Sequence, residues 1–148
     1  MLTEILTAAQ ARARQANLPY LGALTPQEAY RVMQLAPSAR LVDVRAHAEW
    51  DLVGVIPNAV QIEWQAYPGW VANPYFVQQL KQILDHEAML LFICRSGGRS
   101  HRAAEVATQA GYGECYNVLE GFEGDRDKVT QQRILNGWKK AGLPWTQR

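Results

Sequence analysis

The sequence predicts an α/β fold in which an open, mostly parallel central sheet carries helices on both faces. Residues 89–93, Met-Leu-Leu-Phe-Ile, form an apolar run without alternation, which is typical of a strand covered on both faces. Elsewhere, short strand patterns alternate with helical patterns, which indicates parallel strands joined by helical crossovers. A chain of 148 residues, 48% of them hydrophobic, is sufficient for one domain with a sizeable core.

The first part of the chain predicts two helices and two strands. Apolar residues at helical spacing predict a helix that begins near Leu2 and ends before Asn17. Residues 25–28 combine an N-cap threonine, a proline at the first helical position and the glutamate of a capping box, so a helix should run from Pro26 to about Ala36. The segments that follow are a strand at 40–44, a short helical turn at 46–51 and a strand at 59–62.

The second part continues the alternation. Asn73-Pro74 repeats the combination of cap and proline, and the apolar stripe after it predicts a helix packed on the sheet. The segments expected after this helix are the central strand at 89–93, an alanine-rich helix from about Ser100 to Ala110, a strand from Cys115 to Val118 and a last helix from Ile134 to Ala141, ended by Gly142. We expect residues 1–23 to form an accessory helix with its connection, and residues 24–148 to form the single domain.

Composition excludes several classes of protein. Fifteen Lys and Arg against fourteen Asp and Glu leave a net charge of +1, so the overall basic charge of a nucleic-acid binder is missing. Two cysteines and three histidines fit neither a disulfide scaffold nor a structural zinc site. The N-terminal residues lack the apolar run of a signal peptide or membrane helix. We therefore expect a cytoplasmic protein with reduced thiols, no structural zinc site, and no nucleic-acid or membrane partner.

Cys94 lies directly after the central strand, in a loop that leads into the next helix. The loop residues are Cys94, Arg95, Ser96, Gly97, Gly98 and Arg99. Glycines let successive backbone N–H groups point inward as an anion-binding nest, and the start of the helix adds its positive dipole end. This field and the two arginines favour a thiolate nucleophile at Cys94. An arbitrary cysteine is more often a small buried hydrophobe, but the surroundings of Cys94 reverse that preference.

This loop, placed after an apolar strand, resembles the active-site loop of the rhodanese homology domain family. Other segments resemble conserved blocks of the same family in the same order, and together they span roughly residues 24–145. These segments are residues 41–45, 49–50 followed by 54–59, 117–124 and 137–144. The resemblance implies a rhodanese-like fold and a sulfurtransferase in which Cys94 carries a sulfane sulfur as a persulfide.

The sequence departs from the family pattern in two places. Val55 and Asn58 stand where the family has a histidine and a glycine, which affects the geometry of a turn rather than the chemistry. Residues 125–136 form an insert where many members run straight on. Because loops tolerate insertion, we expect the insert to decorate the surface, with a helix beside the active-site mouth as the alternative.

The resemblance implies transfer of sulfur from a small anionic donor such as thiosulfate to cyanide or a thiol, without cofactor or metal. One alternative is a sulfur carrier or binding module that delivers persulfide sulfur to a protein partner. A cysteine-dependent phosphatase is a third class, in which the loop has an arginine at the sixth position after the cysteine. Here Arg99 is the fifth residue after Cys94 and Ser100 the sixth. The shorter ring of amides fits one sulfur atom better than a phosphoryl group.

The two loop arginines have different expected roles. Arg95, directly after the nucleophile, is expected to bind the sulfonate end of thiosulfate. Arg99 is expected either to do the same or to be held by an acidic residue as a brace of the loop. Ser96 should add a hydroxyl donor, and the loop amides of residues 95–99 should stabilise the terminal sulfur of the persulfide.

Residues outside the loop have supporting roles in this interpretation. Asp43 and Arg45 should stabilise the sheet edge and the loop, with Glu49 as one possible partner of Arg45. His101 is expected to face solvent and not to act as a base, and Cys115 to belong to the core. The aromatic residues of the connections are expected to pack in the core or on the surface, although one or more could wall the pocket; they are Trp64, Tyr67, Trp70, Phe122 and Trp145.

Overall fold

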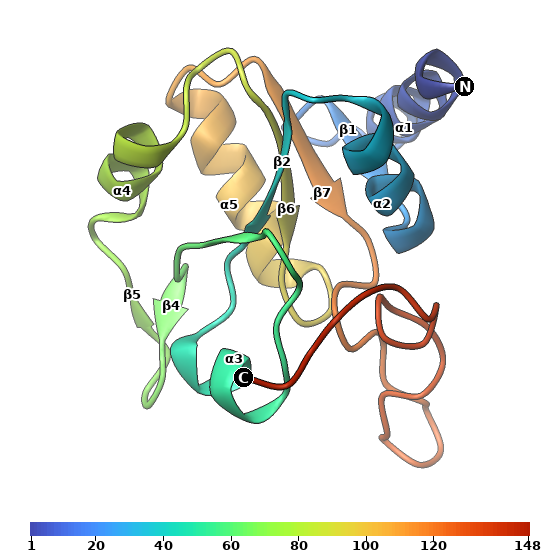
Figure 1. Cartoon of the computed structure of the whole chain (residues 1–148), viewed down its shortest axis with the longest axis vertical. Coiled ribbons are helices and arrows are strands. Elements are labelled where there is room, and N and C mark those ends of the chain that lie inside the picture. Colours follow the sequence, from blue (N-terminus) through green and yellow to red (C-terminus); the bar gives the residue numbers. More distant parts are fainter.

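The computed structural model describes residues 1–148 and is built on a five-stranded parallel sheet with strand order β1-β7-β6-β2-β3 (Figure 1). The strands of this sheet are β1 Gly22–Leu24, β2 Ala39–Asp43, β3 Val60–Gln61, β6 Met89–Ile93 and β7 Glu114–Val118. The helices are α1 Leu2–Ala16, α2 Pro26–Leu35, α3 His47–Leu52, α4 Phe76–Ile83 and α5 Gly98–Gln109. A separate antiparallel hairpin pairs β4 Gln65–Ala66 with β5 Val71–Ala72.

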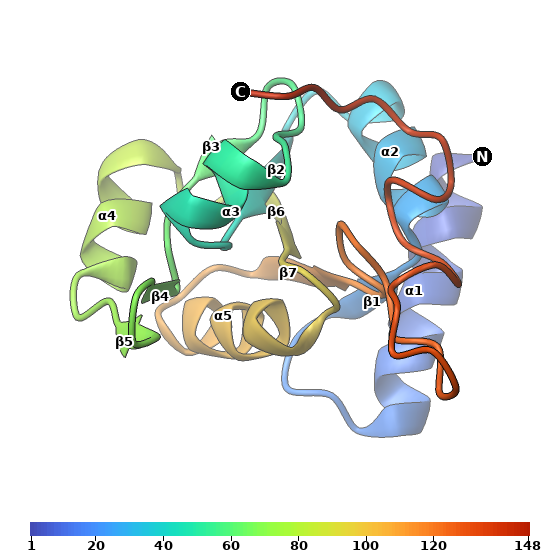
Figure 2. The same cartoon turned by 90° about the horizontal axis from the view of Figure 1, so that it is seen from below.

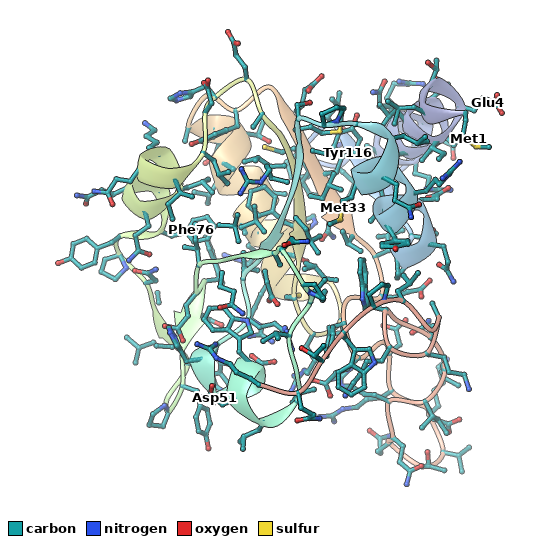
Figure 3. The ribbon with its side chains drawn as sticks, viewed as in Figure 1. Met1, Glu4, Met33, Asp51, Phe76 and Tyr116 are labelled. Carbon is teal, nitrogen blue, oxygen red and sulfur yellow. The ribbon has the colours of Figure 1, made fainter.

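Helices cover both faces of the sheet, as predicted, and strand β6 separates two cores. Leu90 and Phe92 pack in the core beneath α4 and α5, whereas Leu91 and Ile93 pack in the core beneath α1 and α2. Figure 2 shows these two helical layers on opposite sides of the sheet. Figure 3 labels one side chain from each core, Phe76 and Tyr116. Every residue of β6 is buried, which explains its apolar run without alternation.

The predicted end of α1 and the predicted start of α2 are confirmed. Asn17 ends α1 in the left-handed conformation, with φ 54°. The Thr25 hydroxyl accepts the Glu28 N–H at 3.2 Å, and Glu28 Oε1 accepts the Thr25 N–H at 2.9 Å, so the capping box is complete. The start predicted for α4 at Asn73-Pro74 is displaced along the chain, since the helix begins at Phe76. The Asn73 side chain accepts the N–H of Tyr75 and does not cap the helix.

The predicted last helix from Ile134 to Ala141 is wrong. Gly137 has φ +105°, and a Cβ there would lie 2.6 Å from the Gly124 nitrogen. Its N–H donates to the Glu120 carboxylate at 3.0 Å, and the Trp138 N–H donates to the Gly121 carbonyl at 2.9 Å. These backbone donors therefore bind the loop after β7 instead of closing helical turns. The ring of Trp138 is fully buried beneath α2 and fixes this arrangement.

Two features have no counterpart among the predicted elements, namely β1 and the β4–β5 hairpin. Strand β1 has three residues and pairs with β7, and Gly22 lets α1 and the Tyr116 ring approach closely, since a Cβ there would lie 2.6 Å from that ring. Residues 1–23 thus contact the sheet through α1 and most of β1. No helix combines the length and apolar character that crossing a bilayer requires.

The carboxyl ends of the parallel strands lie together at the lower end of the molecule in Figure 1. The loop after β6, helix α3, the β4–β5 hairpin and the segment after β7 gather there. Asp51, labelled in Figure 3, marks α3 at this end. Ligands of open α/β sheets bind at the carboxyl ends of strands, so the fold places the Cys94 loop where a site is expected.

Candidate active site

The Cys94 sulfur lies at the N-terminus of helix α5 and receives a backbone hydrogen bond. The Gly97 N–H donates to Sγ at 3.1 Å, and Gly97 is the N-cap of α5 with φ 110°. Cys94 is 1% exposed and forms part of the core on the α5 side of the sheet. A helix N-terminus and an N–H donor both stabilise negative charge, so the position suits a thiolate or a persulfide anion.

A second hydrogen-bonding group at the sulfur comes from Ser100 rather than from Ser96. The Ser100 hydroxyl lies 3.3 Å from Cys94 Sγ and 2.6 Å from Oδ1 of Asn117. The Asn117 side chain also donates to the Gly97 carbonyl at 3.3 Å. Ser100 and Asn117 are both buried, so they tie β7 to the loop beneath the sulfur. Ser96 is half-exposed, and Gly98 begins α5 in open space, since a Cβ there would meet nothing within 4 Å.

Arg99 is held as a brace by Glu49. Its Nη1 and Nη2 donate to the two Glu49 oxygens at 2.6 and 2.9 Å, and one of these oxygens also accepts the Ala46 N–H at 3.0 Å. Burial alone would raise the pKa of Glu49, but the hydrogen bonds from Arg99 and Ala46 outweigh it and lower this pKa. Of the two roles expected for Arg99, this geometry corresponds to the brace. Glu49 therefore partners Arg99, and its suggested pairing with Arg45 is wrong.

Breaking this brace should make stability depend on pH. In Glu49→Gln we expect a loss of about 1–3 kcal/mol in the free energy of unfolding at pH 7, because Arg99 loses a charged partner. Since the pKa of Glu49 is lowered from 4.5 in the fold, the stabilisation is complete above this value and is lost as the pH falls through the folded pKa. Urea unfolding of both proteins between pH 7 and pH 3 measures this, and a difference that stays constant over the range would contradict it.

Arg95 has no such acidic partner. No carboxylate lies within 4.0 Å of its guanidinium, and its buried Nε makes no hydrogen bond. The side chain borders a cavity of about 310 Å³. The backbone of Arg95 is fixed, because its carbonyl accepts the N–H groups of Glu123 and Gly124 at 3.0 and 3.2 Å. Arg95 thus offers a cation to an incoming anion from a fixed backbone.

Asp43 and Arg45 form a buried ion pair below the loop. Both side chains are 0% exposed; Arg45 Nη2 donates to Asp43 at 2.7 Å and to the Gly54 carbonyl at 2.9 Å. The Arg45 guanidinium also lies 4.1 Å from the centre of the Phe122 ring. Phe122 in turn donates its N–H to the Cys94 carbonyl at 2.8 Å. The pair is therefore linked through Phe122 to the backbone of Cys94, and its supporting role stays a prediction.

The segment after β7 packs tightly on the loop, and the sequence did not predict this contact. Gly121 has φ +67°, and a Cβ at this position would lie 2.5 Å from the carbonyl carbon of Arg95. The insert 125–136 contains no helix and is mostly exposed, as expected of surface decoration. The insert also contacts the residue that holds the loop. Arg133 donates to the Gly124 carbonyl at 2.7 Å, and the N–H of Gly124 donates to the Arg95 carbonyl.

Cys115 and His101 lie outside the reacting centre. Cys115 pairs in register with Leu90, so Cys94 lies roughly 13 Å further along the sheet, too far for a disulfide. Burial raises the pKa of Cys115 to about 11, so it stays a neutral thiol in the core. His101 is half-buried rather than facing solvent, and its Nδ1 lies 2.7 Å from the Tyr20 hydroxyl.

Comparison with known proteins gives consistent results. The family model of the rhodanese-like domain matches residues 25–128 of this chain. An uncharacterized protein of Rickettsia rickettsii is 38% identical over 121 residues, which cover 80% of this chain and 91% of that protein. A sulfurtransferase of Allochromatium vinosum is 29% identical over 104 residues, which cover 70% of this chain and 75% of that protein. The crystal structure of Rv0390 from M. tuberculosis superposes with a TM-score of 0.80 and 41% identity, covering 87% of this chain and 99% of that one.

Proposed function

The chain belongs to the rhodanese-like domain family, and we propose that it is a thiosulfate sulfurtransferase that works through a persulfide on Cys94. Sulfur transfer in general is supported by the family and by the sulfurtransferase of Allochromatium vinosum. The observation that carries the proposal is the position of the Cys94 sulfur at the N-terminus of α5, with the Gly97 N–H at 3.1 Å. We place the protein in the cytoplasm, with residues 24–148 as the functional domain and residues 1–23 as its accessory segment.

In the first half-reaction the Cys94 thiolate attacks the outer sulfur of thiosulfate. A bond forms between the cysteine sulfur and this outer sulfur, the sulfur–sulfur bond of thiosulfate breaks, and its electron pair leaves with sulfite. The charge balances, because a thiolate and a dianion give a persulfide anion and sulfite dianion. The positive end of α5 and the loop N–H groups are suited to stabilise the persulfide.

In the second half-reaction an acceptor nucleophile attacks the terminal sulfur of the persulfide. Cyanide takes up this sulfur as thiocyanate, and the electron pair of the sulfur–sulfur bond returns to Cys94 as thiolate. A cellular thiol would react in the same way and leave as a persulfide. Neither half-reaction requires a general base, which is consistent with the position of His101 at Tyr20 rather than at the sulfur.

The brace on Arg99 argues against a phosphatase. A phosphoryl group needs an arginine free to bind its oxygens at the end of the loop. Here both terminal nitrogens of Arg99 are bound by Glu49, at 2.6 and 2.9 Å. Arg95 remains the loop cation available to a small anion, and it follows the nucleophile directly.

Thiocyanate formation from thiosulfate and cyanide tests the proposal. We expect turnover with the purified protein, and none with the Cys94→Ser variant measured in parallel. Hydrolysis of an aryl phosphate by the wild type that depends on Cys94, without thiocyanate formation, would instead support the phosphatase.

Removing the Arg95 cation should weaken binding of the donor. In Arg95→Ala we expect the KM for thiosulfate to rise about tenfold with a smaller change in kcat, and Arg95→Lys to restore part of the loss. Arg102→Ala is the matched control, because Arg102 is an exposed arginine on α5 without an ion-pair partner. Steady-state kinetics at varied thiosulfate concentration measure the effect, and an unchanged KM in Arg95→Ala would show that this cation does not bind the donor.

A further inference from the structure

The insert 125–136 and the segment after it border a second cavity, next to the one at Arg95. Its volume is about 330 Å³, and its lining residues are Glu123, Arg133, Ile134, Lys139 and Lys140. Figures 1 and 2 show the insert as a loop at the edge of the molecule, beside the C-terminal segment. Three of the lining residues are cations and one is an acid, so the cavity carries a surplus of positive charge.

Arg133 differs from most of the arginines that are withdrawn from solvent. Five arginines are partly or fully buried, and three of them are paired with a carboxylate through two or more hydrogen bonds, namely Arg12, Arg45 and Arg99. The other two, Arg95 and Arg133, have no carboxylate within 4.0 Å. Glu123 lines both of their cavities, so the two unpaired arginines border adjacent sites. Such cations are available to an anion from outside the chain.

The guanidinium of Arg133 is held in position by the backbone. Its Nη1 donates to the Gly124 carbonyl at 2.7 Å, which leaves Nη2 and Nε without a partner in the protein. The two ends of the insert are joined, because Asn136 accepts the Asp125 N–H at 2.8 Å and donates to the Asp125 carboxylate at 3.1 Å. A ligand that binds donors fixed in this way pays little conformational entropy.

Neighbouring cations act against the charge of Arg133. Burial, and then the charges of Arg95 and Arg126, lower the pKa of Arg133, whereas Glu123 and Asp125 act in the opposite direction. The nearby acids therefore do not compensate the burial and the repulsion between the arginines. An anion bound at Arg133 would relieve this repulsion.

The two lysines suit the cavity to a dianion. The Lys139 ammonium is fixed, since it donates to the Val53 carbonyl at 3.1 Å and lies 4.0 Å from the centre of the Trp145 ring. Lys140 is exposed, and its ammonium has no ion-pair partner. An arginine fork beside two ammonium groups matches the charge and the several acceptor oxygens of phosphate better than the single charge of a carboxylate. The volume, roughly eleven times the share of one water molecule in the liquid, also leaves room for an organic group.

We propose that this cavity binds a phosphate dianion, as free phosphate or as the phosphate group of a small metabolite, through Arg133, Lys139 and Lys140. The Arg133 nitrogens that Gly124 leaves free donate to the phosphate oxygens, and the two lysines neutralise its charge. The inference does not depend on sulfur transfer at Cys94, because no bond forms or breaks in this site.

Titrations followed by NMR test the site on the intact chain. Measurements at about pH 7.5, where a phosphate ester is mostly dianionic, and at constant ionic strength give the Kd of inorganic phosphate, ribose 5-phosphate and acetate. The backbone amides whose chemical shifts change locate each ligand. The variants are Arg133→Ala and Lys140→Ala, of which the second removes an exposed side chain without an ion pair and so preserves the fold. Lys128→Ala is the matched control, because Lys128 is an exposed cation of the insert that does not line the cavity.

We expect a Kd for phosphate below about 1 mM, with the largest shifts at Gly124 and residues 133–140, and binding of acetate at least about tenfold weaker. The Kd for phosphate should rise about tenfold in Arg133→Ala and about threefold in Lys140→Ala, and should change less than about twofold in Lys128→Ala.

The two phosphate ligands distinguish the source of the anion. Tighter binding of ribose 5-phosphate than of inorganic phosphate would support a phosphorylated metabolite, and equal affinities would support recognition of the phosphate group alone. A Kd for both above about 1 mM, or acetate bound as tightly as phosphate, would overturn the inference. Shifts confined to residues 94–99, or an equal rise of the Kd in all three variants, would also overturn it.

Discussion

Replacing Cys94 by serine lowers thiocyanate formation by at least about a thousandfold, because the hydroxyl supplies no thiolate and cannot hold a persulfide. Serine is close to cysteine in volume, so the buried position should tolerate the exchange. The oxygen of the introduced serine would still accept from the Gly97 N–H and lie beside the Ser100 hydroxyl. Far-UV circular dichroism checks the fold, and the thiocyanate assay measures the rate.

Cys115→Ser is the matched control for this substitution. Cys115 is also 1% exposed, but it lies near the other end of the sheet, and burial raises its pKa to about 11. We expect this variant to lose some stability, because a hydroxyl replaces a buried thiol, and to keep its turnover near that of the wild type. Turnover that survives in Cys94→Ser and disappears in Cys115→Ser would show that Cys115, and not Cys94, carries the chemistry.

Removing Arg45 gives the largest expected loss of stability, about 3–5 kcal/mol in the free energy of unfolding. The variant Arg45→Ala leaves the Asp43 carboxylate buried without its cation, and it also leaves the Gly54 carbonyl without its donor. For a chain of this length the midpoint of thermal unfolding should fall by roughly 10 °C. Arg40→Ala is the control, because Arg40 is an exposed arginine of the preceding strand β2 without an ion-pair partner.

A double substitution separates the charge from the packing at this pair. Asp43→Asn together with Arg45→Met removes both charges and keeps most of the volume. We expect the double variant to unfold at a higher temperature than Arg45→Ala, because no unpaired charge is left in the interior. A midpoint for Arg45→Ala equal to that of Arg40→Ala would show that the buried pair does not stabilise the scaffold under Cys94.

The elements that local patterns specify were predictable. The capping box at Thr25 and the apolar run at 89–93 depend on neighbouring residues alone, and they place α2 and β6 within one or two residues. The loop after β6 was predictable for the same reason, since the glycines and the cysteine are close together in the sequence. The prediction of the last helix was wrong because groups distant in sequence, Glu120 and Gly124, determine the backbone conformation at Gly137.

The parts of the site that no local pattern specifies were missed or left open. Glu49 is fifty positions from Arg99, so the bidentate pair appears only when α3 and the loop meet at the same end of the sheet. The hydroxyl at the sulfur comes from Ser100, directly beyond the Cys94 loop, although Ser96 is nearer in sequence. Trp70 could be named as one of several aromatic residues, but its contact with Arg99 depends on a hairpin with strands of two residues each.

Mass spectrometry of the intact protein after incubation with thiosulfate tests the persulfide on Cys94 most directly. We predict the addition of one sulfur atom, mapped to the peptide that contains Cys94, and its removal by cyanide with release of an equal amount of thiocyanate. Sulfur uptake at Cys94 with negligible turnover would favour a carrier that delivers sulfur to a protein partner. A protein that takes up no sulfur at Cys94, or that forms thiocyanate without doing so, would contradict the proposed mechanism.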